Sequence, residues 1–209
     1  MRKKTVLLAM LGVVGLAIAQ DAGNTPTIAP PFDVGSIDHA AIGQAQMKAM
    51  MPAKEHEALD YFVGTWTTSG KMFSMGDQPG AQPMQLTGNA TFEWVLGERF
   101  LREHGGGRFM GMEASFERFI GFDTNANRYQ MMSMSTMSTS MSIATGLASM
   151  DGTVIVFYGP LDEPGLNLRD RTVKYILRVH DSNTFAMEVY DPHIGEEHNK
   201  VLEVTYTRE

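Results

Sequence analysis

Five methionines lie within eleven residues of this chain, in a segment rich in serine and threonine: Met131, Met132, Met134, Met137 and Met141. Thioether sulfur binds Cu(I), so the cluster could handle copper if its members gathered on one face. In a strand, however, Met132 and Met134 would face one side, and Met131 and Met137 the other. We therefore favour the alternative in which these flexible side chains fill an irregular core and line an adaptable apolar pocket.

The histidines offer little metal chemistry. All six are widely spaced, and none forms the i, i+4 pair of a helical zinc site. The one local cluster places His193 and His198 near Asp191, Glu196 and Glu197, in a segment typical of a solvated turn. No metal site is predicted.

Two carboxylates could do acid–base chemistry. Glu188 and Glu203 lie on neighbouring predicted strands, and with Arg171 they could supply an acid, a base and an anion clamp. Along these strands apolar residues alternate with charged ones, including Lys174 and Arg178. We favour a charged ladder on a solvated outer face over a polar cavity, although a register slip of one residue would exchange the two. An enzyme is thus the alternative function, and no catalytic residue is assigned.

The composition excludes several classes of function. The chain has 209 residues and no cysteine, which excludes disulfides, thiolate metal sites and a cysteine nucleophile. The net charge of −7 argues against nucleic-acid binding, which needs a basic face. No Gly-x-Ser-x-Gly elbow occurs, and no helix is expected after the Gly105–Gly107 run that could bind phosphate.

Residues 1–19 have the pattern of a signal peptide. Basic Arg2, Lys3 and Lys4 precede an apolar stretch, and Ala17 and Ala19 are the small residues that a signal peptidase reads. The apolar run is short for a membrane helix, although an uncleaved anchor is the alternative. Cleavage removes three basic residues, so the net charge becomes −10. We expect a periplasmic or secreted protein without a membrane anchor.

The elements that must position these residues begin with two short helices. Residues 20–35 contain prolines and small polar residues typical of a flexible linker, and the remaining 36–209 fit one domain. Ser36 to Asp38 would begin a helix that runs to Met51. Pro52 ends it and suits the start of a second helix over Ala53–Phe62.

From Gly64 onward the pattern changes to short strands separated by turn residues. We predict strands over 65–74, 85–95, 99–105, 114–123, 128–135, 140–150, 154–158, 171–179, 184–190 and 200–207. Asp151-Gly152 is the strongest hairpin signal among the turns. A sheet of about ten antiparallel strands must curl or close, so we predict an all-β barrel with an N-terminal helical lid.

The first and last predicted strands resemble those of the calycin superfamily, which includes lipocalins and fatty-acid-binding proteins. Gly64-Thr65-Trp66 opens the first strand after a short helix, and Arg208 ends the last strand. The resemblance implies that Arg208 stacks on the indole of Trp66 and closes one end of the barrel. Some calycin proteins bind haem through a barrel histidine, for which His104 is the best candidate here.

A closer resemblance, over about Met51 to Arg208, is to the bacterial domain-of-unknown-function family 1579. Its matching stretches follow one another along the whole domain: 55–59, 63–66, 96–101, 119–123, 133–139, 171–173, 187–190 and 203–208. The resemblance implies a lipocalin-like barrel and no particular reaction.

The predicted function is non-catalytic binding of a small apolar or amphipathic molecule inside the barrel, with no cofactor. The residues expected to line that site are Phe92, Trp94, Phe100, Phe116, Met132, Met134, Phe157, Tyr175 and Met187. A copper-handling protein is the second alternative, after an enzyme.

Overall fold

The fold was analysed in a computed structural model. The structure describes residues 38–73, 82–109, 111–163, 167–195 and 199–209, and the predicted leader and linker lie outside them. One compact unit spans Ala40–Glu209. No helix among the described residues has the length and apolar character needed to cross a membrane.

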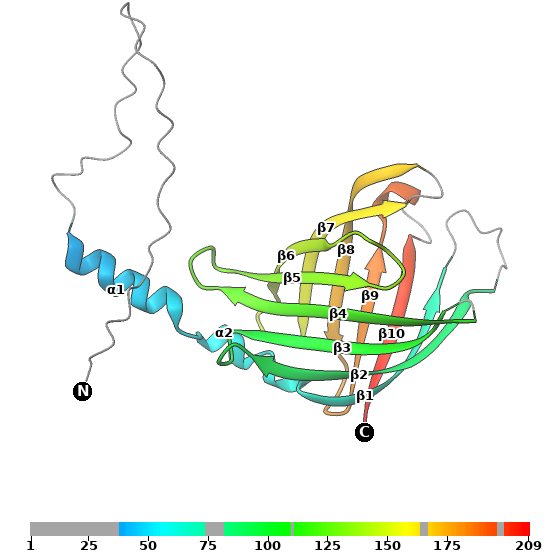
Figure 1. Cartoon of the computed structure of the whole chain (residues 1–209), viewed down its shortest axis with the longest axis horizontal. Coiled ribbons are helices and arrows are strands. Elements are labelled where there is room, and N and C mark those ends of the chain that lie inside the picture. The colour runs from blue at the N-terminus through cyan, green and yellow to red at the C-terminus, as the bar shows by residue number, and fades with distance from the viewer. Residues whose placement is uncertain (1–37, 74–81, 110, 164–166, 196–198) are drawn as a thin grey trace, which may run out of the picture. The chain divides into compact units, whose positions relative to one another are not determined.

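The described residues form a closed antiparallel barrel of ten strands, in which each strand pairs with its neighbours in sequence and β10 returns to pair with β1 (Figure 1). The strands are β1 Gly64–Met72, β2 Met84–Val95, β3 Phe100–Phe109, β4 Met112–Asp123, β5 Arg128–Ser135, β6 Ser142–Ala148, β7 Val154–Glu163, β8 Leu168–Val179, β9 Thr184–Tyr190 and β10 Lys200–Arg208. The predicted fold class is therefore confirmed.

Two turns follow the predicted chemistry, whereas two strands run on through glycines that were predicted to end them. Asp151-Gly152 connects β6 to β7, with Gly152 at a φ of +71°. Asp123 accepts hydrogen bonds from the backbone amides of Asn125 and Ala126 in the β4–β5 turn, both at 2.9 Å. The predicted end of a strand at 105 is wrong, because the glycine run 105–107 lies inside β3 and pairs with both β2 and β4. The predicted end at 158 is wrong as well, since β7 runs on to Glu163 and pairs with β8.

The N-terminal helices differ from a simple lid. Helix α1 spans His39–Met50 and has no buried residue, so its methionines do not pack into the barrel. The second predicted helix is divided into α2, Lys54–Glu57, and the 3₁₀ turn η2, Asp60–Phe62. Leu59 and Phe62 of this segment are buried in the barrel core, so α2 and η2 close one end of the barrel.

Aromatic residues fill this closed end. The indole of Trp66 donates a 2.7 Å hydrogen bond to the carbonyl of Phe62. Phe185 stands edge-on to Phe62 and Trp66 at 4.9 and 4.7 Å, and stacks on Tyr206 at 4.2 Å. Such packing contributes beyond the area that it buries, and it forms a rigid base for the rest of the barrel.

Arg208 joins the last strand to the first and to η2. Its guanidinium lies 4.1 Å above the Trp66 ring and donates to the carbonyls of Val63 at 2.8 Å and Tyr61 at 2.5 Å. Gly64 has a φ of +130°, and a Cβ there would lie 2.9 Å from an Arg208 nitrogen. This is the arrangement of Gly64, Trp66 and Arg208 that the calycin resemblance implies.

Replacing Arg208 with lysine tests this closure. Lysine keeps the charge but loses the planar fork that stacks on Trp66 and reaches two carbonyls, so Arg208→Lys should lower the free energy of unfolding by about 1–3 kcal/mol. Urea denaturation measures this difference, and Arg169→Lys, at an exposed position of β8, is the matched control. Equal midpoints for the two variants would contradict the assigned role.

Candidate ligand-binding cavity

A cavity of about 320 Å³ lies inside the barrel and borders the aromatic end at Tyr206. This volume is at the lower end of the range typical of ligand pockets. Strands β1, β2, β3, β4, β5, β9 and β10 supply the walls, which are mainly apolar side chains and glycine backbone. The lining includes Thr68, Gly70, Met72, Leu86, Gly88, Gly107, Phe116, Met137, Met187, Leu202 and Val204.

Glycines keep the β2–β3 wall free of side chains. Gly88 and Gly107 pair directly, and a Cβ on either would lie 2.2 Å from a backbone oxygen of the opposite strand. A Cβ at Gly105 would meet the backbone of β2 and, at 2.9 Å, the ring of Phe116. The glycine run therefore permits a close approach of strands and leaves the space that the cavity occupies.

A buried charged cluster borders this apolar space. Arg118 lines the cavity, pairs through Nη1 with Glu103, and is only 8% exposed. Tyr206 donates a 2.8 Å hydrogen bond to the other oxygen of Glu103, which is fully buried. Burial raises the pKa of Glu103, and burial together with the nearby carboxylate raises the pKa of Tyr206. Removing either charge alone would leave its partner buried and uncompensated.

One polar atom of this cluster has no partner within the described residues. The Nε of Arg118 is buried and makes no hydrogen bond to them. Buried donors are almost always paired in native proteins. Arg118 also lines the cavity, so an acceptor on a bound molecule could satisfy this buried donor once the guanidinium turns toward it.

A second buried pair joins β8 to the β9–η4 junction. Arg171 contacts Asp191, whose other oxygen accepts the backbone amide of His193 at 3.0 Å, at the start of η4, Pro192–Ile194. Asp191 is fully buried, so its expected place in a solvated turn is wrong. The rest of that acidic cluster, residues 196–198, lies outside the described residues.

Of the nine predicted lining residues, Phe116 and Met187 line the cavity. Phe92, Phe157 and Tyr175 face inward but lie in the packed core, at exposures of 2, 0 and 7%. The interior is therefore divided into an aromatic core and a smaller cavity, a division that alternation along a strand does not predict.

Four of the nine lie elsewhere. Trp94 is partly buried against the core at the closed end, where its indole donates a 2.7 Å hydrogen bond to Asp60 of η2. Phe100 is 37% exposed and borders a surface pocket with the end of α1. Both were expected to contact a ligand inside the barrel. Trp94 is separated from the cavity because it lies at the α2–η2 end, and Phe100 because it lies on the outer face beside the buried Leu101.

Met132 and Met134 were also wrongly placed in the interior. The buried residues of β5 are Tyr129 and Met131, so the intervening and following positions 130, 132 and 134 face outward. The register agrees, since Met132 pairs with Ile143, which is 57% exposed. The five clustered methionines thus divide between the core and the outer surface.

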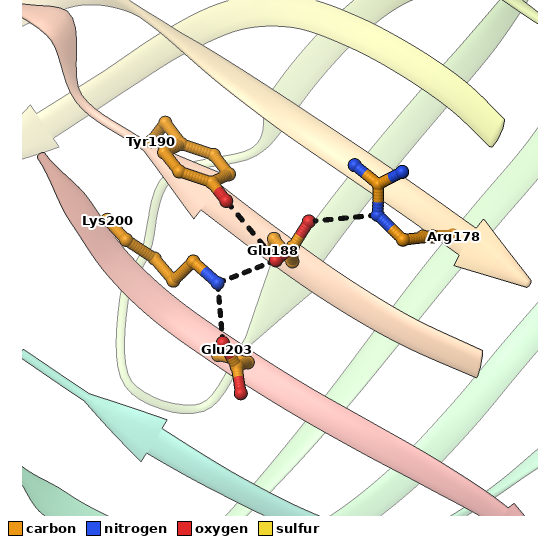
Figure 2. Close-up of polar contacts among 5 residues, drawn as sticks. All are labelled: Arg178, Glu188, Tyr190, Lys200 and Glu203. Carbon is orange, nitrogen blue, oxygen red and sulfur yellow. Dashed lines mark hydrogen bonds and ion pairs between the residues drawn. The ribbon is translucent and has the colours of Figure 1, made fainter. Parts of the chain in front are cut away.

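The carboxylates considered for catalysis lie on the outer face, as the preferred interpretation predicts, but Glu188 is only 8% exposed and therefore not solvated as that interpretation expected. Glu188 and Glu203 are register partners, and Lys200 bridges them at 2.6 and 2.5 Å (Figure 2). Arg178 lies 3.5 Å from Glu188, and Tyr190 donates to it at 3.2 Å. Arg171 faces inward in its pair with Asp191, so the three groups proposed for an enzyme do not converge.

No histidine of the described residues lines the cavity. His104 pairs with Thr91 and Glu117 on the outer face, and its side chain is 40% exposed. It therefore does not fit the role of an interior haem ligand. The described residues also contain no group of three or more His, Asp or Glu that could hold a metal ion.

Among solved structures, the chain is similar to Rv2717c from M. tuberculosis, with 16% identity and a TM-score of 0.53. The match covers 76% of this chain and 99% of that chain. A redesigned β-barrel, b11L5F_LGL, matches at 13% identity and a TM-score of 0.37, over 73% of this chain and 95% of that chain. No curated protein matches.

Fold and cavity together define a closed antiparallel β-barrel protein with a small, mainly apolar interior site. The family model described as protein of unknown function, DUF1579, matches residues 51–208. The chain belongs to this family, as its sequence stretches indicate.

Glu188 makes the outer network sensitive to pH. Burial would raise the pKa of Glu188, but Lys200, Tyr190 and Arg178 together lower it below the ordinary 4.5. A carboxyl with a lowered pKa stabilises the folded chain above its unfolded pKa, and this contribution is lost as the pH falls through the folded value. Glu188→Gln should therefore show a shallower loss of stability between about pH 5 and pH 3 than the unsubstituted chain.

Urea midpoints measured across this pH range test that prediction. Glu113→Gln, at an exposed position of β4, is the control and should keep the original slope. The same slope in Glu188→Gln as in the unsubstituted chain would show that the network contributes nothing to acid sensitivity.

The close approach of β2 and β3 gives a second prediction. Gly107→Ala should lower the free energy of unfolding by about 1–3 kcal/mol, because its Cβ would overlap a backbone oxygen that cannot move aside cheaply. Gly43→Ala in α1, where a Cβ meets nothing within 4 Å, is the control and should be neutral or slightly stabilising. Thermal denaturation of both variants measures the difference, and equal losses would contradict it.

Proposed function

We propose that this chain binds a small, largely apolar molecule carrying one hydrogen-bond acceptor, inside the cavity bordered by Arg118. The observation that carries the proposal is a mainly apolar cavity of about 320 Å³ lined by Arg118, whose buried Nε has no hydrogen-bond partner among the described residues. Apolar walls with a few placed polar groups are the usual composition of small-molecule sites.

Charge balance favours an acceptor over a full ionic partner. The charge of Arg118 is already matched by Glu103, and the other charged residue of the lining, Arg108, is exposed. A bound anion beside Arg118 would therefore add an uncompensated buried charge. A neutral carbonyl or ether oxygen satisfies the free Nε–H without that cost. The ligand is therefore expected to be neutral or weakly polar, with most of its surface against Leu202, Val204 and Met187.

The proposal includes export. Residues 1–19 carry the charge, length and small-residue pattern of a signal peptide, and the chain contains no cysteine that would need a reducing compartment. Expression of the full chain with its leader should yield a periplasmic or secreted protein whose intact mass is that of a chain beginning at Gln20. Retention of the leader on a membrane-bound product would favour the uncleaved anchor instead.

Fluorescent probes test binding in the cavity. N-phenyl-1-naphthylamine is neutral and apolar, and its emission rises when water is excluded. Val204→Phe would place a ring in the cavity, so we expect it to weaken probe binding by at least about tenfold, equivalent to 1.4 kcal/mol. Thr205→Phe adds the same ring to the outer face of the same strand, and it should leave binding within about twofold.

The two variants distinguish binding inside the barrel from binding elsewhere. Equal binding in both variants would place the probe outside the barrel, and no binding by the unsubstituted chain would count against the proposal directly. Circular dichroism shows whether each variant folds. Because filling the cavity could also raise stability, loss of probe binding in a variant with an unchanged or higher melting temperature is the decisive result.

Comparison with an anionic probe tests the expectation that the ligand is neutral. The anionic probe 1-anilinonaphthalene-8-sulfonate has the same ring system plus a sulfonate. It should bind more weakly than the neutral probe to the unsubstituted chain, and the difference should shrink in Arg118→Met with Glu103→Gln, which removes both charges together. Stronger binding of the sulfonate would show that the site selects anions.

A further inference from the structure

A groove next to the cavity, with which it shares Gly106, Ser115, Phe116 and Ser135, brings together one histidine and two methionines. Its lining includes His104 of β3, Met134 of β5 and Met141 just before β6. We propose that these three side chains form a Cu(I) site, with one imidazole nitrogen and two thioether sulfurs as ligands. This proposal does not depend on the ligand of the interior cavity.

The strand register brings His104 and Met134 within reach of one ion. His104 pairs with Glu117, and Glu117 pairs with Met134, so the three share the outer face of adjacent strands. Neighbouring strands lie about 4.8 Å apart, which places the Cα atoms of His104 and Met134 about 10 Å apart. A histidine and a methionine leaning toward each other across Glu117 span this distance with a metal ion between them.

Met141 approaches from the loop that follows β5. The loop is fixed to β4 because the amide of Thr136 donates to the carbonyl of Ser115 at 2.9 Å and the Ser115 amide donates to the Thr136 hydroxyl at 3.0 Å. Ser138 and Ser140 are hydrogen-bonded to each other at 2.7 Å just before it. Met141 is 56% exposed, so its thioether is accessible from solvent at the groove.

The one carboxylate among the residues that line the groove, Glu117, is already paired with Arg102. Arg102 donates to both oxygens of Glu117, at 2.8 and 2.7 Å, and these hydrogen bonds hold the pKa of Glu117 below its ordinary value. A hard divalent ion would have to compete with this bidentate pair. The remaining donors are soft or borderline, and such donors favour Cu(I).

The imidazole of His104 is not held by a hydrogen bond at Nδ1. This nitrogen is buried without a hydrogen-bond partner among the described residues, and a carboxylate oxygen of Glu93 lies 3.9 Å away. No hydrogen bond at Nδ1 therefore has to be broken when the ring turns to bind a metal ion.

Anaerobic Cu(I) titration of the purified full chain, in competition with bicinchoninate, tests the site. We expect one Cu(I) per chain, and X-ray absorption should show one nitrogen and two sulfur neighbours. Met134→Leu with Met141→Leu should weaken binding by more than about 100-fold, since even outer partners of metal ligands contribute about 10–100-fold. His104→Gln should weaken it by at least about tenfold.

The controls isolate the groove. Met112→Leu with Met150→Leu removes two exposed methionines that do not line it, and Cu(I) affinity should not change. Leucine has nearly the volume of methionine, so the variants should fold, as thermal melts would show. Binding of N-phenyl-1-naphthylamine should persist in all of them, which separates this proposal from that for the cavity.

Two results would overturn the proposal. One is an unsubstituted chain that cannot take Cu(I) from the competitor, and the other is full affinity in the variant without Met134 and Met141. Zn²⁺ binding equal to that of Cu(I) would also contradict a site built from soft donors.

Discussion

The pairing of β10 with β1 is the constraint on which the rest of the structure depends. Once the sheet is closed, each strand has an inner and an outer face, and one register shift would exchange the two everywhere. Arg208 stabilises this closure because it stacks on Trp66 and bonds the backbone of the segment that caps the barrel. In a chain without cysteine, no covalent link replaces that contact.

Closure also determines where charge can lie. On the outer face, Lys200 joins Glu188 and Glu203 in a network that water still reaches, and such pairs contribute modestly to stability. Inside, Glu103 with Arg118 and Arg171 with Asp191 are buried in an otherwise apolar barrel. Apolar residues of similar volume would often be as stable there, so these pairs are better explained by specificity or function. Only Arg118 of the four also lines the cavity.

Much of the fold could be predicted because it depends on local patterns. Alternation located each of the ten strands, and Asp151-Gly152 marked the turn between two of them.

The residues of the site were harder to predict from the sequence. Met132 and Met134 were assigned inward because a strand pattern gives two faces without saying which is inside, whereas the register puts Met131 in the core. Glu103 and Arg118 were missed, although each occupies an apolar-face position, between Leu101 and Gly105 and between Phe116 and Ile120. The strand was predicted to end at 105 because the glycines 105–107 allow the backbones of β2 and β3 to come close together. That role depends on the neighbouring strand and is not visible in the sequence of β3 itself.

The central claim is that a small apolar molecule binds on the inner face of the barrel beside Arg118. Methionine methyl groups report on this directly, because Met72 and Met187 line the cavity while Met132 faces outward. The measurement is an NMR experiment that detects contacts between bound N-phenyl-1-naphthylamine and assigned methionine methyl groups. The account predicts contacts to Met72 and Met187, with a shift of the Arg118 Nε–H resonance. Contacts to Met132 with none to Met187 would contradict it.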